Sequence, residues 1–74
     1  MENNKSKLKN ETVGDKIKHL RLKQGLTQDA LAKKADIPYT TFTKIESNVI
    51  TSPTIQTVEK IARGLKISID DLLK

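Results

Sequence analysis

Residues 27–48, TQDALAKKADIPYTTFTKIESN, constrain the fold of this chain more than any other segment. Their apolar positions recur at helical spacing in two stretches, and the register breaks between them where a tight turn is expected. Small residues in the first stretch let two short helices cross closely. The residues expected to face inward are Leu31, Ala32, Ala35, Ile37, Phe42 and Ile45.

The inward register of the second stretch leaves its opposite face free. That face carries Tyr39, Thr40, Thr43 and Lys44, whose side chains can all form hydrogen bonds and include no acid. The segment therefore predicts a short scaffold helix that presents a second, polar helix to a partner.

The rest of the chain continues the helical pattern, and no segment alternates with the period of two that a strand requires. Thr12 with Asp15, and Ser68 with Asp71, are spaced as helix caps, and Gly25 suits a left-handed helix end. We expect helices over about 13–24, 27–35 and 38–47, a fourth from 52–54 onward, and a short fifth that contains Ile69, Leu72 and Leu73. The inward residues of the fourth are expected to be Ile55, Val58, Ile61, Ala62 and Leu65. The predicted fold class is all-α.

A length of 74 residues allows one small core. Residues 1–11 are rich in Asn and Lys, so we expect a flexible polar N-terminal arm, either a solvated tail or a segment that touches DNA. Residues 12–74 are then the folded domain. They leave no separate domain to sense a small molecule, so no small-molecule ligand is expected.

The composition excludes several classes of protein. Cysteine is absent, and His19 has no second His or Cys to complete a metal site, so neither metal nor cofactor is expected. No apolar run approaches the roughly 18 residues that span a bilayer, and the N-terminus lacks a signal-peptide core. We therefore expect a cytoplasmic protein without membrane contact. Because no nucleophile and base arrangement or phosphate-binding glycine loop is present, no enzyme is expected.

The net charge of +5 is a moderate basic excess, and residues 12–74 carry eleven basic and seven acidic side chains. An excess of this size suits a polyanionic partner such as nucleic acid without requiring one. The sign of the charge therefore agrees with a polar helix that meets DNA.

Over roughly residues 13–73 the chain resembles the Cro/C1-type helix-turn-helix family of phage repressors and their small bacterial relatives. The resemblance rests on the order and spacing of three segments, VGDKIKHLRLKQGLTQDALA, IPYTTFTKIESN and SPTIQTVEKIARGLKISIDDLL. It implies a compact five-helix, lambda-repressor-like domain that binds double-stranded DNA as a homodimer, with the third helix in the major groove. The operator would have two half-sites about one helical turn apart.

Carried onto this sequence, the resemblance assigns roles to individual residues. Tyr39, Thr40, Thr43 and Lys44 would face the bases, and Thr27, Gln28, Thr41, Ser47, Asn48 and Thr51 would lie near phosphates. Arg21 and Glu46 stand where family members commonly have an ion pair between the first and third helices. Leu22, Ile69 and Leu73 are candidates for a dimer contact. A tyrosine packed on a neighbour, ordinary surface threonines and an isolated surface leucine remain the alternative interpretations.

The chain departs from the family where it has Asp36, Asn48 and Lys66, because family members often have glycine at these helix ends. A left-handed Lys66 would cost on the order of 1 to 2 kcal/mol, so we expect the fourth helix to end differently. Pro38 replaces the usual Ser or Thr cap. The loop after the third helix lacks Lys and Arg, so we expect a weaker phosphate contribution there.

The sequence favours a sequence-specific transcriptional regulator, and two alternatives stay open. One is an antitoxin or another protein-binding module, for which DNA binding would be secondary. An antitoxin normally adds a segment that wraps its partner, and only residues 1–11 could serve. The other alternative, within the DNA-binding class, is a restriction-modification controller protein, which is similarly short.

Overall fold

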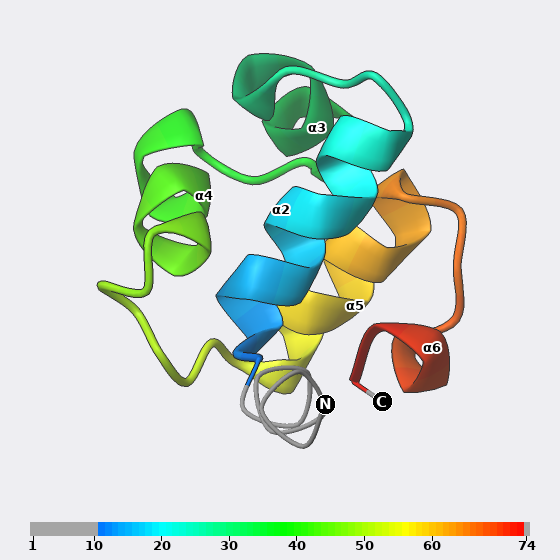
Figure 1. The fold of residues 1–74 in the computed structure, drawn as a ribbon. Helices are drawn as coiled ribbons and strands as arrows, with labels where there is room; N and C mark the ends of the chain where they lie inside the picture. The colour runs from blue at the N-terminus through cyan, green and yellow to red at the C-terminus, as the bar shows by residue number, and fades with distance from the viewer. Residues whose placement is uncertain (1–10, 74) are drawn as a thin grey trace, which may run out of the picture.

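The structure is a computed structural model, and it describes residues 11–73. Five helices and no strand occupy this part of the chain, as the sequence predicts (Figure 1). The predicted N-terminal arm lies outside the described residues except for Glu11, and so does Lys74. The helices are α2 (Val13–Lys23), α3 (Gln28–Ala35), α4 (Tyr39–Glu46), α5 (Ile55–Gly64) and α6 (Ile69–Leu73).

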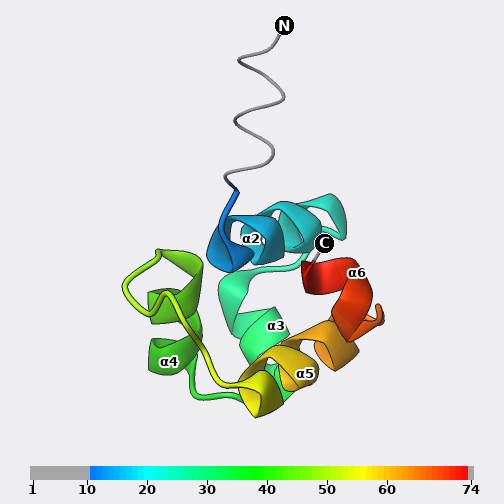
Figure 2. The same cartoon turned by 90° about the horizontal axis from the view of Figure 1, so that it is seen from below.

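The helices pack around one core, with α4 and α6 at opposite edges of the molecule (Figures 1 and 2). Helix α2 packs against both α4 and α6, while α3 packs against α4 and α5. The first helix in this part of the chain thus holds the two edges together. Among the described helices, α4 has neighbours on one side only, which leaves the other side free.

The core is built by the apolar stripes that the helical spacing predicts. All six residues predicted to face inward from 27–48 are buried, and Phe42 has no exposed surface. The largest fully buried side chains are Phe42, Ile17, Leu31, Ile45, Ile61, Leu65 and Leu72. Burying a side chain of this size contributes about 1.5 to 3 kcal/mol, so a core this small depends on each of them.

Ile55 was predicted to face inward, and this prediction is wrong because 64% of its surface is exposed. It is the first residue of α5, whose other predicted residues are buried. Helical spacing gives the face on which a residue lies but not whether a neighbour covers that turn. Within residues 11–73, no neighbouring element covers the Ile55 side chain.

Side-chain hydroxyls cap four of the five described helices. Thr12, Thr27, Thr54 and Ser68 each accept a hydrogen bond from the backbone N–H three residues later, at 3.0 to 3.2 Å. Helix α4 is the exception, because Pro38 precedes it and provides no side-chain cap. The first N–H groups of α4 therefore lack the side-chain acceptor that the other helices have.

Three residues other than glycine adopt the left-handed conformation, at the positions where family members often have glycine. They are Asp36, Asn48 and Lys66, with φ of 59°, 68° and 61°. The expectation that α5 would end differently is wrong. The N–H groups of Lys66 and Ile67 donate to the carbonyls of Arg63 and Ala62 at 3.0 Å, so the usual closing bonds form despite the lysine. Among the described helices, none has the length and hydropathy of a membrane span.

Candidate nucleic-acid interface

Helix α4 presents one polar face to solvent. Tyr39 has 51% of its surface exposed, Thr40 and Lys44 are exposed, and Thr43 is half-buried. Phe42, Ile45 and Glu46 are buried on the opposite face. The Thr43 hydroxyl donates to the Thr40 carbonyl at 2.9 Å, which leaves its lone pairs and methyl group available. The four residues predicted to face bases therefore share the free side of α4.

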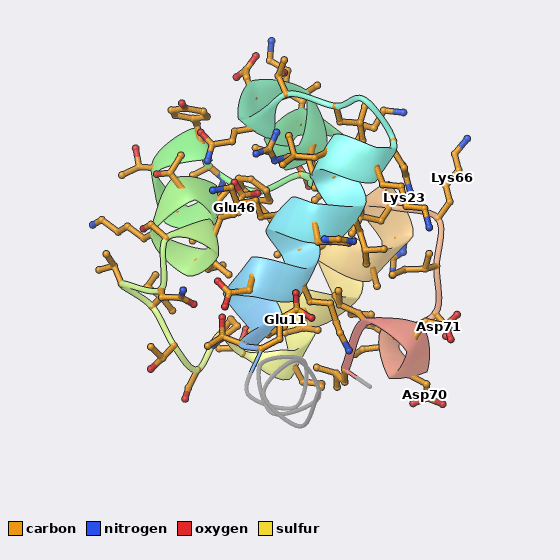
Figure 3. The ribbon with its side chains drawn as sticks, viewed as in Figure 1. Glu11, Lys23, Glu46, Lys66, Asp70 and Asp71 are labelled. Atoms are coloured by element: carbon orange, nitrogen blue, oxygen red, sulfur yellow. The ribbon has the colours of Figure 1, made fainter. Side chains whose placement is uncertain are left out.

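An ion pair joins α2 to the last residue of α4. Arg21 Nε and Nη2 donate to the two carboxylate oxygens of Glu46 at 2.8 and 2.9 Å. A third donor, Nη1, bonds the Leu26 carbonyl at 2.7 Å. Arg21 and Glu46 are only 8% and 5% exposed, and Glu46 points from α4 toward α2 (Figure 3). This two-point pairing fixes both the position and the rotation of the C-terminal end of α4.

Gln28 belongs to the same network. Its Nε2 donates to Glu46 Oε1 at 2.8 Å, so the amide is turned inward from the first turn of α3. One N–H of this amide is used, and the second is free to donate to a phosphate. A helix N-terminus also offers unpaired backbone N–H groups to an anion. The structure thus makes Gln28 a link between α3 and α4 as well as a candidate contact.

The remaining residues predicted near phosphates do not form one cluster. Thr27 is exposed and caps α3, Ser47 is exposed at the end of α4, and Thr51 is exposed in the following loop. Thr41 is half-buried beside the α4–α5 loop, where it lines a groove with Ile50. These residues therefore border the α4 face on three different elements.

Asn48 is placed differently from the other predicted phosphate contacts, because both ends of its amide are already bonded. Its Oδ1 accepts from the Thr12 hydroxyl at 2.6 Å, and its Nδ2 donates to Asp15 Oδ1 at 3.0 Å. The bond to Asp15 holds the pKa of that carboxyl below its usual value, and the Thr12 backbone N–H acts in the same direction. Sequence reasoning missed this contact. The only signal was an amide side chain where glycine is common.

The charges near α4 are few. Lys44 is the one basic side chain on the helix itself, and Lys33 and Lys34 end the neighbouring α3. Lys33 lies 3.3 Å from Asp29 in an exposed pair. Lys23 and Lys66 lie on the side of the molecule away from α4 (Figure 3). Neutral donors thus make up most of the polar surface around α4.

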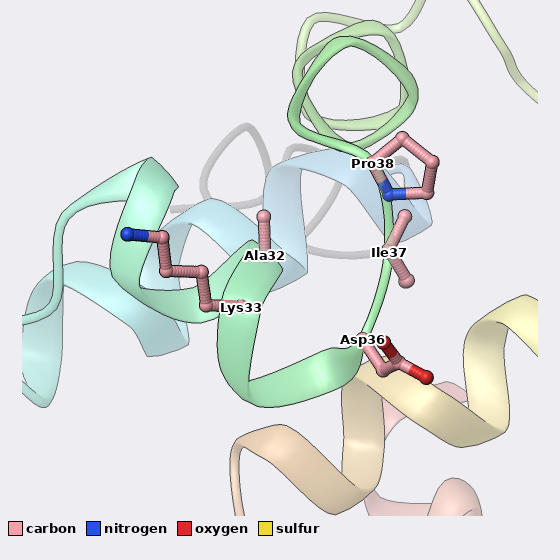
Figure 4. Close-up of a pocket in the computed structure, with 5 residues that line it drawn as sticks. All are labelled: Ala32, Lys33, Asp36, Ile37 and Pro38. Atoms are coloured by element: carbon pink, nitrogen blue, oxygen red, sulfur yellow. The ribbon is translucent and has the colours of Figure 1, made fainter.

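A hollow lies at the α3–α4 turn, between Ala32, Lys33, Asp36, Ile37 and Pro38 (Figure 4). The Lys33 side chain extends away from Ile37 and Pro38, so no polar groups converge in it. We interpret it as the seam between the two helices. Within residues 11–73, no group of three His, Cys, Asp or Glu side chains gathers as a metal site would require.

The candidates for a dimer contact differ in exposure. Leu22 and Leu73 have 58% and 52% of their surfaces exposed, whereas Ile69 is half-buried against the core. Their helices, α2 and α6, pack against each other. Leu22 and Leu73 therefore carry most of the free apolar surface among the three.

A helix-turn-helix family model matches residues 17–72. The HTH-type transcriptional regulator SinR of Bacillus subtilis (strain 168) is 36% identical over 61 residues, which cover 82% of this chain and 55% of SinR. The chain thus spans about half the length of the curated relatives it matches.

Solved structures of SinR have the same fold as this chain. SinR in a crystal structure with DNA, described as the master regulator for biofilm formation, superimposes with a TM-score of 0.80 at 35% identity. That match covers 85% of this chain and 100% of the other. SinR in a complex with the SinI protein also superimposes with a TM-score of 0.80 at 35% identity, and that match covers 85% of this chain and 61% of the other.

Proposed function

Because this chain belongs to the Cro/C1-type helix-turn-helix family, we propose that it is a sequence-specific DNA-binding transcriptional regulator. The observation that carries the proposal is the polar, acid-free face of α4, held outward by the buried residues behind it. The crystal structure of the relative SinR with DNA supports it. A regulator of this kind would act in the cytoplasm and would need no catalytic chemistry.

In this proposal α4 enters the major groove. The Tyr39 ring would contact a thymine methyl or place its hydroxyl at a phosphate, and Lys44 would meet guanine O6 and N7 or a phosphate. Thr40 and Thr43 would add hydrogen bonds and methyl contacts to base edges. The phosphate contacts would come from Thr27, Gln28, Thr41, Ser47 and Thr51 around the helix.

The direct test is a titration of labelled duplexes with the purified protein. We expect it to bind DNA from the upstream region of its own gene, and to select a preferred duplex from a random-sequence library. If about four phosphates per subunit are neutralised, log affinity of a dimer should fall with log salt at a slope near ~7. A response that does not depend on salt would refute groove binding.

Single substitutions test the assignment of residues. Tyr39→Ala or Lys44→Ala should weaken binding to the selected duplex by ~1 to 3 kcal/mol with an unchanged melting temperature. Tyr39→Phe keeps the ring and removes only the hydroxyl, so a comparison with Tyr39→Ala shows which of the two groups contributes to binding. Lys23→Ala is the matched control for Lys44→Ala, because it removes the same charge on the side away from α4. Equal losses for the two lysine variants would mean that only net charge matters.

We further propose that the protein acts as a homodimer on an operator with two half-sites about one helical turn apart. Leu22 and Leu73 are the exposed apolar side chains that a second copy would cover. Sedimentation should give a dimer for the wild type and a monomer for Leu22→Glu. Ile55→Glu, at a similarly exposed isoleucine, is the control and should stay dimeric. A monomeric wild type at micromolar concentration would overturn this part.

A protein-binding role is the second candidate function, and the complex of the relative SinR with SinI supports it. In that case the chain should co-purify with a protein partner and bind no duplex without it. A regulator should bind DNA when pure. The two functions therefore separate in one purification followed by one titration.

A further inference from the structure

Two contacts from α2 hold the C-terminal end of α4. The first is the buried ion pair between Arg21 and Glu46. The second lies two residues further along the chain, where Asn48 bonds both Thr12 and Asp15. The two contacts lie toward opposite ends of α2, so they resist rotation of α4 better than either one alone.

The second contact joins three residues by four hydrogen bonds, two of them from backbone N–H groups, and we call it the amide junction (Thr12, Asp15 and Asn48). The Thr12 hydroxyl accepts from the Asp15 N–H at 3.0 Å, and the Thr12 N–H donates to Asp15 Oδ2 at 3.4 Å. The Asn48 amide completes it with one bond to each residue, at 2.6 Å to Thr12 and 3.0 Å to Asp15. The capping box of α2 therefore serves also as the docking point for Asn48, two residues beyond the end of α4.

The backbone at this point explains why the amide reaches its partners. A Cβ on Gly14 would lie 2.2 Å from the Ile45 carbonyl and 2.8 Å from Asn48 Oδ1. The first turn of α2 therefore touches the last turn of α4 directly. Asn48 adopts a left-handed conformation, with φ of 68°, which turns the chain so that its side chain lies over that first turn.

We propose, resting on the proposed function, that the amide junction sets the orientation of α4 in the groove, and that Asn48 is a positioning residue rather than a phosphate contact. Thr12 and Asp15 bind both ends of the Asn48 amide and so fix the direction in which it points, which favours this role over the one the family resemblance implies. One Nδ2 N–H is left over, as in Gln28, so an exchange of the Asp15 and Asn48 side chains tests whether it meets a phosphate. Base hydrogen bonds tolerate only a few tenths of an ångström, so a small rotation of α4 displaces Thr43 and Lys44 from base edges. The Asp15 carboxyl reports the contact, because the Asn48 amide is the largest cause of its lowered pKa.

The exposure of the amide junction makes its effects on stability and on recognition separable. All three residues are exposed, so their hydrogen bonds contribute little to the free energy of unfolding. Asn48→Gly removes the side chain and at the same time relieves the left-handed backbone. We expect a nearly unchanged melting temperature, roughly tenfold weaker binding to the selected duplex, and little change with an unrelated duplex.

An exchange of the two side chains gives the decisive test. Asn48→Asp alone places two carboxylates face to face and should weaken binding roughly tenfold or more, while Asp15→Asn alone loses one bond and should have a smaller effect. The double variant Asp15→Asn with Asn48→Asp can form all four hydrogen bonds again and keeps the net charge. Only the bond between positions 15 and 48 changes direction, because the amide at position 15 now donates to the carboxylate at position 48. It should bind within about threefold of the wild type.

The outcomes distinguish a positioning role of Asn48 from a phosphate contact, and both from a failure of the proposed DNA binding. If Asn48 contacts a phosphate, the double variant still directs a carboxylate at the DNA, and binding stays as weak as in Asn48→Asp. Equal losses on the selected and the unrelated duplex for Asn48→Gly would also overturn the positioning role. A wild type that binds no duplex refutes the proposed function itself, and the positioning role fails with it.

Discussion

Replacing Glu46 with Gln should strongly reduce the stability of this domain. Glu46 accepts two hydrogen bonds from Arg21 and one from Gln28, at 2.8 to 2.9 Å. The substitution keeps the shape of the side chain, so no cavity forms. It leaves the Arg21 guanidinium, 8% exposed, without its counter-charge.

The size of the effect follows from that burial. Removing one partner of a buried ion pair costs about 3 to 5 kcal/mol, because the remaining charge stays out of water. The total free energy of unfolding expected for a domain of 74 residues is about 4 to 11 kcal/mol. Glu46→Gln should therefore lower the melting temperature by at least ~12 °C, and it should leave the variant partly unfolded near 37 °C.

Urea unfolding followed by circular dichroism at the helical band measures this loss directly. Asp29→Asn is the matched control, since it removes one carboxylate from the exposed pair with Lys33 and should cost under about 1 kcal/mol. The double variant Arg21→Met with Glu46→Leu should recover most of the stability, because two apolar side chains need no counter-charge. A loss below about 1 kcal/mol for Glu46→Gln would refute the reasoning and mean that water reaches the pair.

Three further predictions concern the core and the α2–α4 contact. Phe42→Ala should cost about 3 to 5 kcal/mol and unfold so small a domain, as seen by loss of cooperative melting. Gly14→Ala should destabilise by about 1 kcal/mol or more in urea titrations despite the better helix propensity of alanine, because the new Cβ would lie 2.2 Å from the Ile45 carbonyl. The pKa of Asp15 is lowered by folding, so its contribution to stability is present above the usual pKa and disappears as the pH falls through the lowered one. NMR titration should therefore find a higher Asp15 pKa in Asn48→Gly than in the wild type, and an equal Asp15 pKa in the two proteins would mean that the Asn48 amide does not bind this carboxylate.

The sequence by itself determined the fold class and the two faces of α4. Spacing of three and four residues is a local property of the helix, so it was enough to predict the buried positions of 27–48 and the outward set Tyr39, Thr40, Thr43 and Lys44. Helix caps are equally local, because donor and acceptor are three residues apart. The capping box predicted from the spacing of Thr12 and Asp15 is present in the structure.

Only the tertiary structure decided which polar groups meet across the chain, and which apolar ones are covered. Asn48 lies 36 residues from Thr12 in the sequence. A side-chain amide can bond a phosphate, a hydroxyl or a carboxylate equally well, so the residue type alone does not predict its hydrogen-bond partner. Ile55 has the right spacing for the core but stays exposed at the start of α5. Periodicity follows from the geometry of one helix. Whether an apolar side chain is covered, and which polar groups form hydrogen bonds, depends on how several helices are placed in space. The same placement sets the orientation of α4.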